Sequence, residues 1–465
     1  MILATRSEDR SLADISGEGP LRDGQHSDAQ LTGRAGTPPN FPDYVDRGPF
    51  RFFSSLAWDG RNGDMRRAGP WIEVAEAPFG LQARGIYDRM EEALSDCGGL
   101  AAVLRQHMYQ RDKRRFPVLE AIRQERELDG VAPSSGLGLT SLRDDEVNYE
   151  IDAIALSPQG ATRLGPRTVL DSPGVGEAAA LYSQAVAAGP YIFTAGMLAL
   201  APDKSWAVTS FDDIAEEGRW LQRGRSHPDH RTGPVISQTW TLYERFDAFL
   251  RELGLELSQV ANATVFIHDE GDFADALRVH EHWFASEGPA LQVIPVDEVG
   301  HKGSVIEIEI TATRGSLRRM PGPSGAPPSV VQADGLIFVS DHLPITGDGR
   351  ILWIDDASAY FRREAALARI AADLDPEQQL LATQMWVALK NLLGSLDEFG
   401  IEGEALGQVT VRLLNHSRSG VPWLVDMFRS VLGDVDRAVV LLAVPWIPQS
   451  KYARVSVSGV GFSDV

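Results

Sequence analysis

The stretch "VANATVFIHDEGDFADALRVHEHWF", residues 260–284, contains two hydrophobic patterns in one run. Its first eight residues are mostly apolar and β-branched, which predicts a buried strand. The apolar residues of its second half recur at spacings of three and four, which predicts an amphipathic helix. A strand followed by a helix that covers it indicates a layered fold of strands and helices.

Two other stretches follow the same order of strand and helix. They are "LAAVLRQHMYQRD" with "FPVLEAIRQER", residues 100–126, and "LGQVTVRLLNHSRSGVPWLVDMFRSVLG", residues 406–433. Each of the three pairs follows a short strand and a longer helix that is closed by glycine, and each precedes two further strands. The chain is therefore predicted to contain three α+β units of the order strand, helix, strand, helix, strand, strand, with the helices on one face.

Composition shifts along the chain predict the limits of these units. Residues 1–44 are polar and carry too few large apolar groups to offset the entropy of ordering, so a disordered tail is expected. Stretches dense in proline and glycine, at 157–174 and 315–329, predict linkers. The predicted domains are residues 45–160, 174–315 and 328–465.

The charge balance excludes several classes of partner. There are 44 basic and 65 acidic residues, so the formal net charge of -21 disfavours nucleic acid and anionic membranes as partners. A single cysteine, Cys97, excludes an intrachain disulfide framework and a Cys-based zinc site. With neither a secretory apolar core at the N-terminus nor a run of about 18 apolar residues, we expect a cytoplasmic protein.

The histidines of the opening stretch raise the question of a metal site, because His268, His280 and His282 lie among carboxylates. On a helix, residues two apart point in different directions, whereas helical metal pairs favour spacings of three or four. The spacing of His280 and His282 therefore favours solvated or packed histidines, and we expect no metal. No glycine-rich phosphate loop follows a strand, so no organic cofactor is implied.

The second unit, through "LYSQAVAAGPYIFTAGMLAL" (181–200), the opening stretch and "GPALQVIPVDEVGHKGSVIEIEITATR" (288–314), resembles the RidA/YjgF family of enamine and imine deaminases. The other two units match more weakly, through the order of their elements. Members of this family form homotrimers with ligand sites between subunits. The resemblance thus implies three tandem RidA-like (chorismate-mutase-like) α+β domains, fused as a pseudo-trimer around a central β-barrel.

The resemblance also implies catalytic residues. In the family, the arginine of Pro-Ala-Arg-Ser anchors a substrate carboxylate, and the residues matched to it here are Ser135, Leu291 and Arg437. Only the third unit would then keep the anchor. The first glutamate of Val-Glu-Ile-Glu, which handles the attacking water, matches Glu150 and Glu307, whereas the third unit has serine at that position.

Other family positions imply substrate contacts. The tyrosine that lines the cleft matches Tyr182, and the backbone amide after the first small strand residues matches Gly196, Ser55 or Asp341. The cysteine of the family is absent, which excludes a thiol-dependent role at that position. The residues that replace it are Leu137, Val293 and Val439.

These residues lead to a functional hypothesis. A RidA-like enzyme would act on a small molecule with an imine, enamine or related polar double bond, by addition or loss of water at an inter-domain cleft. Arg437 would orient an anionic or carbonyl-bearing substrate, and Glu150 or Glu307 would move the proton. A specialised biosynthetic step fits the loss of arginine in two units, and the fused chain could form a further homodimer. The alternative is a catalytically silent ligand-binding or scaffold protein, in which Arg437 is a surface or ion-paired residue.

Overall fold

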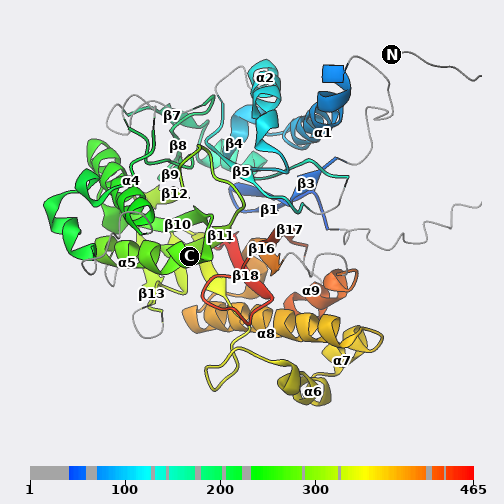
Figure 1. Cartoon of the computed structure of the whole chain (residues 1–465). Helices are drawn as coiled ribbons and strands as arrows, with labels where there is room; N and C mark the ends of the chain where they lie inside the picture. Colours follow the sequence, from blue (N-terminus) through cyan, green and yellow to red (C-terminus); the bar gives the residue numbers. More distant parts are fainter. Residues whose placement is uncertain are drawn as a thin grey trace, which may run out of the picture. The chain divides into compact units, whose positions relative to one another are not determined.

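The computed structural model describes residues 41–58, 71–126, 131–142, 146–172, 180–201, 206–222, 232–284, 288–322, 326–414, 421–433 and 436–464. Residues 1–40, which make up most of the predicted tail, lie outside this part of the chain. The described strands form three six-stranded sheets, here called A, B and C in chain order (Figure 1).

Sheet A and its helices come from the first unit. In chain order they are β1 (Tyr44–Arg47), β2 (Phe50–Phe53), β3 (Leu56–Ala57), α1 (Trp71–Ala93), β4 (Val103–Gln110), α2 (Phe116–Arg126), β5 (Ser134–Gly138) and β6 (Tyr149–Leu156). The strands lie in the order β1-β2-β6-β4-β5, and β3 also pairs with β6. Helix α2 connects β4 to β5 as a crossover, which makes these two strands parallel.

Sheet B follows the short helix α3 (Pro158–Arg163). Its elements are β7 (Thr168–Leu170), β8 (Ala185–Ala188), β9 (Tyr191–Thr194), α4 (Gly233–Glu252), β10 (Val260–Ile267), α5 (Phe273–Phe284), β11 (Ala290–Pro295) and β12 (Ile306–Thr313). The strand order is β11-β10-β12-β9-β8-β7. As in sheet A, the last strand inserts beside the central one, and the pair joined by the second helix is parallel.

Sheet C repeats this arrangement. Its elements are β13 (Leu317–Met320), β14 (Val330–Ala333), β15 (Leu336–His342), α6 (Ile354–Arg363), α7 (Ala365–Ala371), α8 (Pro376–Phe399), β16 (Leu406–Leu414), α9 (Leu424–Leu432), β17 (Ala438–Val444) and β18 (Val455–Phe462). The order is β13-β14-β15-β18-β16-β17. The three mixed sheets with their helices confirm the predicted α+β class.

The structure adds strands that the sequence did not predict. Each unit opens with an antiparallel hairpin rather than a single strand. Strands β7 and β13 lie inside the segments 157–174 and 315–329, which were predicted as linkers, and they extend sheets B and C by pairing with β8 and β14. Both strands are short runs without proline, so the backbone N–H groups that a ladder requires are present.

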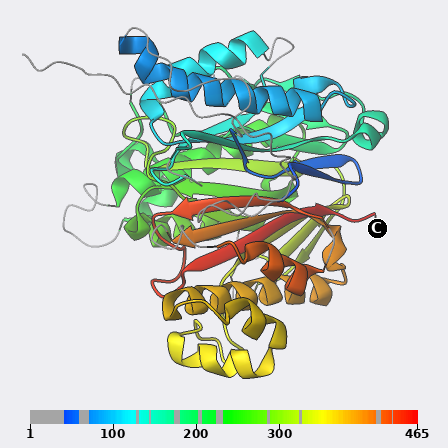
Figure 2. The same cartoon turned by 90° about the vertical axis from the view of Figure 1, so that its right-hand side faces the viewer.

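The three sheets meet along their strands, and the helices lie outside them. Figure 2 shows α1 and α2 (blue and cyan) on one side of the strands and α8 and α9 (orange) on the other. Strand β4 contacts β8 and β9, β11 contacts β15, and β17 contacts β2, so each sheet contacts both of the others. Aromatic rings fill one meeting point, where Phe50 packs against Tyr191 at 5.2 Å and Phe462 at 5.8 Å between ring centroids.

Strand pairing does not extend from sheet to sheet as a continuous ladder. Among the described residues, the one bridge between sheets joins Gly138 to Glu298. The expected closed barrel is therefore not found, and the pseudo-trimer around it stays a prediction. In the same part of the chain, no helix has the length and the apolar character that crossing a bilayer requires.

Candidate functional site

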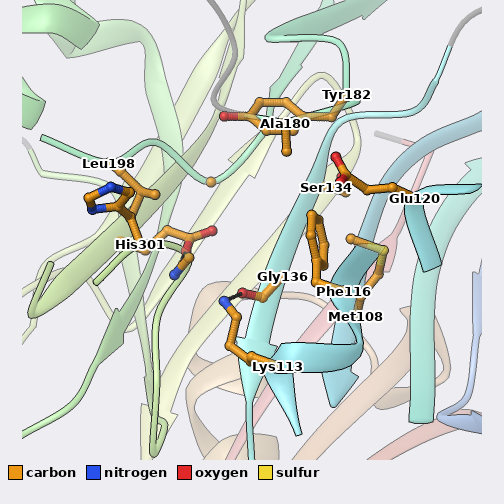
Figure 3. A pocket seen from close by; sticks show the side chains of 13 residues that line it. Met108, Lys113, Phe116, Glu120, Ser134, Gly136, Ala180, Tyr182, Leu198 and His301 are labelled. Carbon is orange, nitrogen blue, oxygen red and sulfur yellow. Dashed lines mark hydrogen bonds between the residues drawn. The ribbon is translucent and has the colours of Figure 1, made fainter. Parts of the chain in front are cut away.

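A cavity of about 210 Å³ lies where sheet A meets sheet B (Figure 3). From the first unit it is lined by Met108, Lys113, Phe116, Glu120 and Ser134, among others. From the second unit it is lined by Tyr182, Gly196, Leu198, Gly300, His301 and Glu307. Three residues that the resemblance implies, Tyr182, Gly196 and Glu307, thus come together at one place. A concave site with converging polar groups is typical of small-molecule binding.

Glu307 is the central acid of this cavity. It lies on β12 opposite Phe266 of β10, and it is only 2% exposed. Burial raises the pKa of Glu307 to about 7, although the Lys113 ammonium and a hydrogen bond from Gly300 N to Oε2, at 3.0 Å, oppose this. Near neutral pH the carboxyl group is therefore present in both protonation states, as a general acid–base catalyst requires.

Lys113 is a cavity residue that the sequence analysis missed. Its ammonium donates to Gly136 O at 2.6 Å and to Val299 O at 2.8 Å, so it bridges the two units. Burial lowers the pKa of Lys113, while the charges of Glu307 and Glu298 raise it. In the sequence it belongs to a basic run between a strand and a helix, a pattern that is typical of a solvated surface.

Three polar groups at the cavity have no protein partner within the described residues. The amides on either side of Gly196 donate to backbone carbonyls, whereas its own N–H meets no acceptor there. The Ser134 hydroxyl is buried at 3% exposure without a hydrogen-bond partner, and His301 Nδ1 also lacks one. Because buried polar groups are normally satisfied, these groups are suited to bind a ligand or ordered water.

Glycine is required at position 196 for steric reasons. A Cβ there would collide with Glu307 Oε1 and would lie 2.5 Å from Ser135 Oγ. The backbone of this segment therefore approaches the Glu307 carboxyl group more closely than any side chain would allow. The amide of Gly196 and the carboxyl of Glu307 face the same small volume.

A buried charged network lies next to the cavity. His107 contacts Glu309 Oε1 through Nε2 at 2.8 Å and Asp152 Oδ2 through Nδ1 at 3.2 Å, and Ser135 Oγ donates to Glu309 Oε2 at 2.9 Å. Although burial and Arg105 oppose it, the two carboxylates raise the pKa of His107. His107 and Arg105 in turn lower the pKa of Glu309, against its burial. An ionised Glu309 two residues from Glu307 helps to keep the latter's pKa raised.

The C–A interface, between the third and first units, is closed by hydrogen bonds. Ser55 N donates to Val439 O at 3.1 Å, and Ser55 Oγ accepts from Leu441 N at 3.2 Å. Ser54 Oγ accepts from Val439 N at 2.9 Å. Glu150, which was predicted as catalytic, is buried in β6 opposite Tyr109 and does not line the cavity. The candidate residues Ser55 and Glu150 are thus not brought to the site.

At the B–C interface, an ion pair of the third unit contacts the second unit. Asp341 Oδ1 lies 2.9 Å from Arg412 Nη1, and its Oδ2 accepts from Val293 N at 2.8 Å. Burial raises the pKa of Asp341, and Arg412 opposes this rise. The candidate Asp341 therefore serves this interface and not the cavity.

The strand register corrects the match to the family arginine. Strands β4, β10 and β16 each have a β-bulge near their start, which gives a common reference point. At the same distance from that bulge, the residues paired with these strands in the parallel ladders are Ser134, Leu291 and Val439. Arg437 lies two residues before that point and Ser135 one residue after it, so neither residue is in register with Leu291. The family proline that would fix the register is absent before β17. None of the three interfaces has arginine at this position.

Arg437 itself is buried in the third unit. It is 3% exposed, and its Nη2 donates to Gly403 O at 3.0 Å. Burial, together with Arg47, lowers the pKa of Arg437 to about 10. It does not line the cavity, so its predicted role as substrate anchor has no support from this geometry.

The histidines of residues 260–284 are engaged in packing. His280 Nδ1 contacts the Tyr243 hydroxyl at 2.7 Å, and burial lowers the pKa of His280 to about 3. The His282 ring stacks on Trp240 with centroids 5.2 Å apart. The described part of the chain contains no group of three or more side chains suited to hold a metal ion.

Comparisons with known proteins place this site in context. The family model described as Endoribonuclease L-PSP matches residues 227–314, a segment that runs through α4, β10, α5, β11 and β12. A RutC family protein of Pyrococcus abyssi is 28% identical over 131 residues, which are 28% of this chain and 84% of that protein.

Solved structures show similar chains. RidA from Psychrobacter sp. PAMC 21119 is 22% identical, with a TM-score of 0.24, and the match covers 31% of this chain and 98% of that one. A chorismatase is 13% identical, with a TM-score of 0.46, and the match covers 79% of this chain and 95% of that one. Gly300 and Glu307 lie inside the segment that the family model matches, so the second unit, which supplies half of the cavity, is similar to the RidA/YjgF family.

Proposed function

We propose that the cavity between sheets A and B is the active site of a RidA-like enzyme, which adds water to the C=N bond of a small imine and releases ammonia. An enamine would enter the same reaction through its imine tautomer. The observation that carries this proposal is Glu307, a buried carboxyl group with a pKa of about 7, in a cavity that also holds three polar groups without a protein partner among the described residues. A proton donor and acceptor that works near neutral pH is what hydration of an imine needs.

The reaction would use Glu307 twice. Its carboxylate takes a proton from a water molecule as the water oxygen bonds to the imine carbon and the π electrons move to nitrogen. The resulting carboxylic acid returns that proton to the nitrogen, which gives a carbinolamine. A second proton transfer, from the carbinolamine hydroxyl to its nitrogen, breaks the C–N bond and leaves a carbonyl compound and ammonia.

The other polar groups of the cavity would orient the substrate. The Gly196 N–H is suited to donate to an oxygen or imine nitrogen at the reacting end, and Ser134 Oγ offers a second polar contact. Preorganised donors of this kind stabilise developing negative charge without a reorganisation cost. Lys113, fixed by two carbonyl oxygens, stabilises the ionised form of Glu307.

We also propose that the three units are arranged as a pseudo-trimer around a barrel-like centre, with one interface kept open for catalysis. The repeated strand order and the contact of each sheet with both others support this arrangement. A cytoplasmic location, a specialised biosynthetic reaction and a further homodimer belong to the same proposal.

Ammonia release tests the proposed reaction. Imines generated in place by an amino-acid oxidase are offered to the protein and to Glu307→Gln, whose amide oxygen can still accept the hydrogen bond from Gly300. We expect the substitution to lower kcat/KM roughly a hundredfold or more. Glu125→Gln on the exposed face of α2 serves as the control. If the native protein hydrolyses no imine although the cavity binds amines, the catalytically silent alternative is correct.

A further inference from the structure

Helix α2 presents two residues to the cavity. Phe116 and Glu120 are four residues apart, so they lie on the same face of the helix. Figure 3 shows both on the side opposite Leu198 and His301. Glu120 is half-buried, and its Oε1 accepts from Leu181 N at 3.2 Å, whereas its other oxygen meets no partner among the described residues. A carboxylate oxygen is thus available to a ligand.

The charges of the cavity disfavour an anion at this end. Lys113 is the one Lys or Arg among the described lining residues, and its ammonium already donates to two carbonyl oxygens and faces Glu307 and Glu298. The family position for arginine holds Ser134. Glu120 therefore has no cationic partner among the described lining residues, and the cavity carries two acids against one engaged base.

A second observation, independent of the charges, supports ligand binding here. The Ser134 hydroxyl, on β5, lines the same cavity and is buried at 3% exposure without a hydrogen-bond partner. A buried hydroxyl without a partner is uncommon in a folded protein. Glu120 lines the same cavity, so a polar group bound by Glu120 shares this volume with the Ser134 hydroxyl.

We propose that the cavity recognises an imine substrate whose remote end carries a cationic nitrogen group, an ammonium, amidinium or guanidinium, and that Glu120 binds this group. The proposal rests on the proposed function, because it takes this cavity as the substrate site. Two aromatic residues, Phe116 and Tyr182, also line the cavity, and aromatic rings attract a cation rather than an anion. The preference is opposite to the anionic substrate expected from the sequence.

A set of three imines isolates the remote group. An L-amino-acid oxidase acting on arginine, norleucine and glutamate produces imines with the same C=N group and the same carboxylate, but with a cationic, neutral or anionic end. We expect kcat/KM for ammonia release to be roughly tenfold or more higher with the arginine-derived imine than with the glutamate-derived one, because a charge-assisted hydrogen bond forms only with the former.

Substitutions at Glu120 then identify the residue responsible. Glu120→Gln keeps an acceptor for Leu181 N but removes the charge, so the preference should fall to near unity. Glu120→Lys should reverse it in favour of the glutamate-derived imine. Glu125→Gln, on the same helix but paired with Arg84 at the surface, should keep the native preference.

The outcomes separate this inference from the proposed function. Equal hydrolysis of all three imines, or a preference for the anionic one, overturns the role of Glu120 and leaves imine hydrolysis intact. If no imine is hydrolysed, the proposed function fails, and calorimetric titration with agmatine tests recognition alone. Binding that is lost in Glu120→Gln then supports the inference, and binding that is absent or independent of Glu120 overturns it.

Discussion

The three interfaces between the sheets use the same backbone position in different ways. At the end of the second hairpin strand, the residue pair is Ser54-Ser55 just after β2, Ala195-Gly196 just after β9 and Ser340-Asp341 in the last residues of β15. Both serines at the first position accept a hydrogen bond from the neighbouring sheet, Ser54 from Val439 N and Ser340 from Leu291 N, each at 2.9 Å. Ala195 has no hydroxyl to do so.

The second position of the pair completes the difference. Ser55 and Asp341 connect their interfaces through side-chain hydrogen bonds, whereas Gly196 has no side chain and its amide is left to the cavity. Two small residues thus keep open the interface that contains Glu307. In a fused chain each interface changes independently, so one can keep a binding site while the others become structural contacts.

The largest effect is expected from filling the open interface. In Gly196→Ala the added methyl group collides with Glu307 Oε1, so either the carboxyl group or the strand must move. We expect kcat/KM for ammonia release to fall at least about a hundredfold, because displacement of the reacting group by an ångström has effects of this size. Overpacking should also lower the free energy of unfolding by about 1–3 kcal/mol.

The control for this prediction uses the closed interface. Ser55→Ala removes one acceptor, that of Leu441 N, without adding volume, and it should leave the reaction rate unchanged. A Gly196→Ala protein that is folded by circular dichroism and fully active would show that the cavity is not the active site.

A stability effect without an activity effect is expected at the B–C interface. Arg412→Met removes the partner of Asp341, which would then be a buried, uncompensated carboxylate. Breaking a buried pair in this way costs about 3–5 kcal/mol of stability. Urea unfolding measures the loss, and ammonia release below the unfolding transition should be unaffected.

The pH dependence of stability in Arg412→Met provides the control for this prediction. Because the pKa of Asp341 is raised in the folded state, the variant should regain stability as the pH falls and the carboxyl group becomes protonated. A stability loss that does not depend on pH would mean that Arg412 contributes through packing rather than through its charge.

A shift in pH dependence is expected from Lys113→Met. The reaction needs the ionised form of Glu307, so the rate should rise with pH and level off above about 7. Removal of the ammonium, which lowers this pKa, should move the midpoint of the rise to higher pH. Rate profiles between pH 5 and 9 measure the shift, and Arg114→Met, an exposed neighbour, is the control. An unchanged midpoint would exclude coupling between Lys113 and Glu307.

The sequence was most informative where the pattern is local. Hydrophobic periodicity predicted the repeated strands and helices, because this pattern depends only on the spacing of apolar residues within each element. The family motifs of the second unit located Glu307, Gly196 and Tyr182. Lys113 was missed because its role depends on two carbonyl oxygens, one of them 186 residues away in the chain.

The residues matched to the family arginine show how far a short sequence motif can fix the alignment of a strand. In the first two units a proline stands two residues before the matched residue, yet the strand register of Leu291 corresponds to that of Ser134, one residue before the matched Ser135. The segment before β17 has no proline, so the match moved by two residues to the nearby arginine. Register is set by backbone pairing between distant strands, which a short motif does not encode.

The smallest effect is therefore expected from Arg437→Met. The guanidinium lies outside the cavity and donates to Gly403 O, so its removal changes packing in the third unit and not the reacting groups. We expect kcat/KM for ammonia release to change by no more than about twofold, whereas removal of a substrate anchor would lower it far more. A hundredfold loss in a protein that remains folded would place catalysis at the C–A interface. The A–B cavity would then be an interface without catalytic activity.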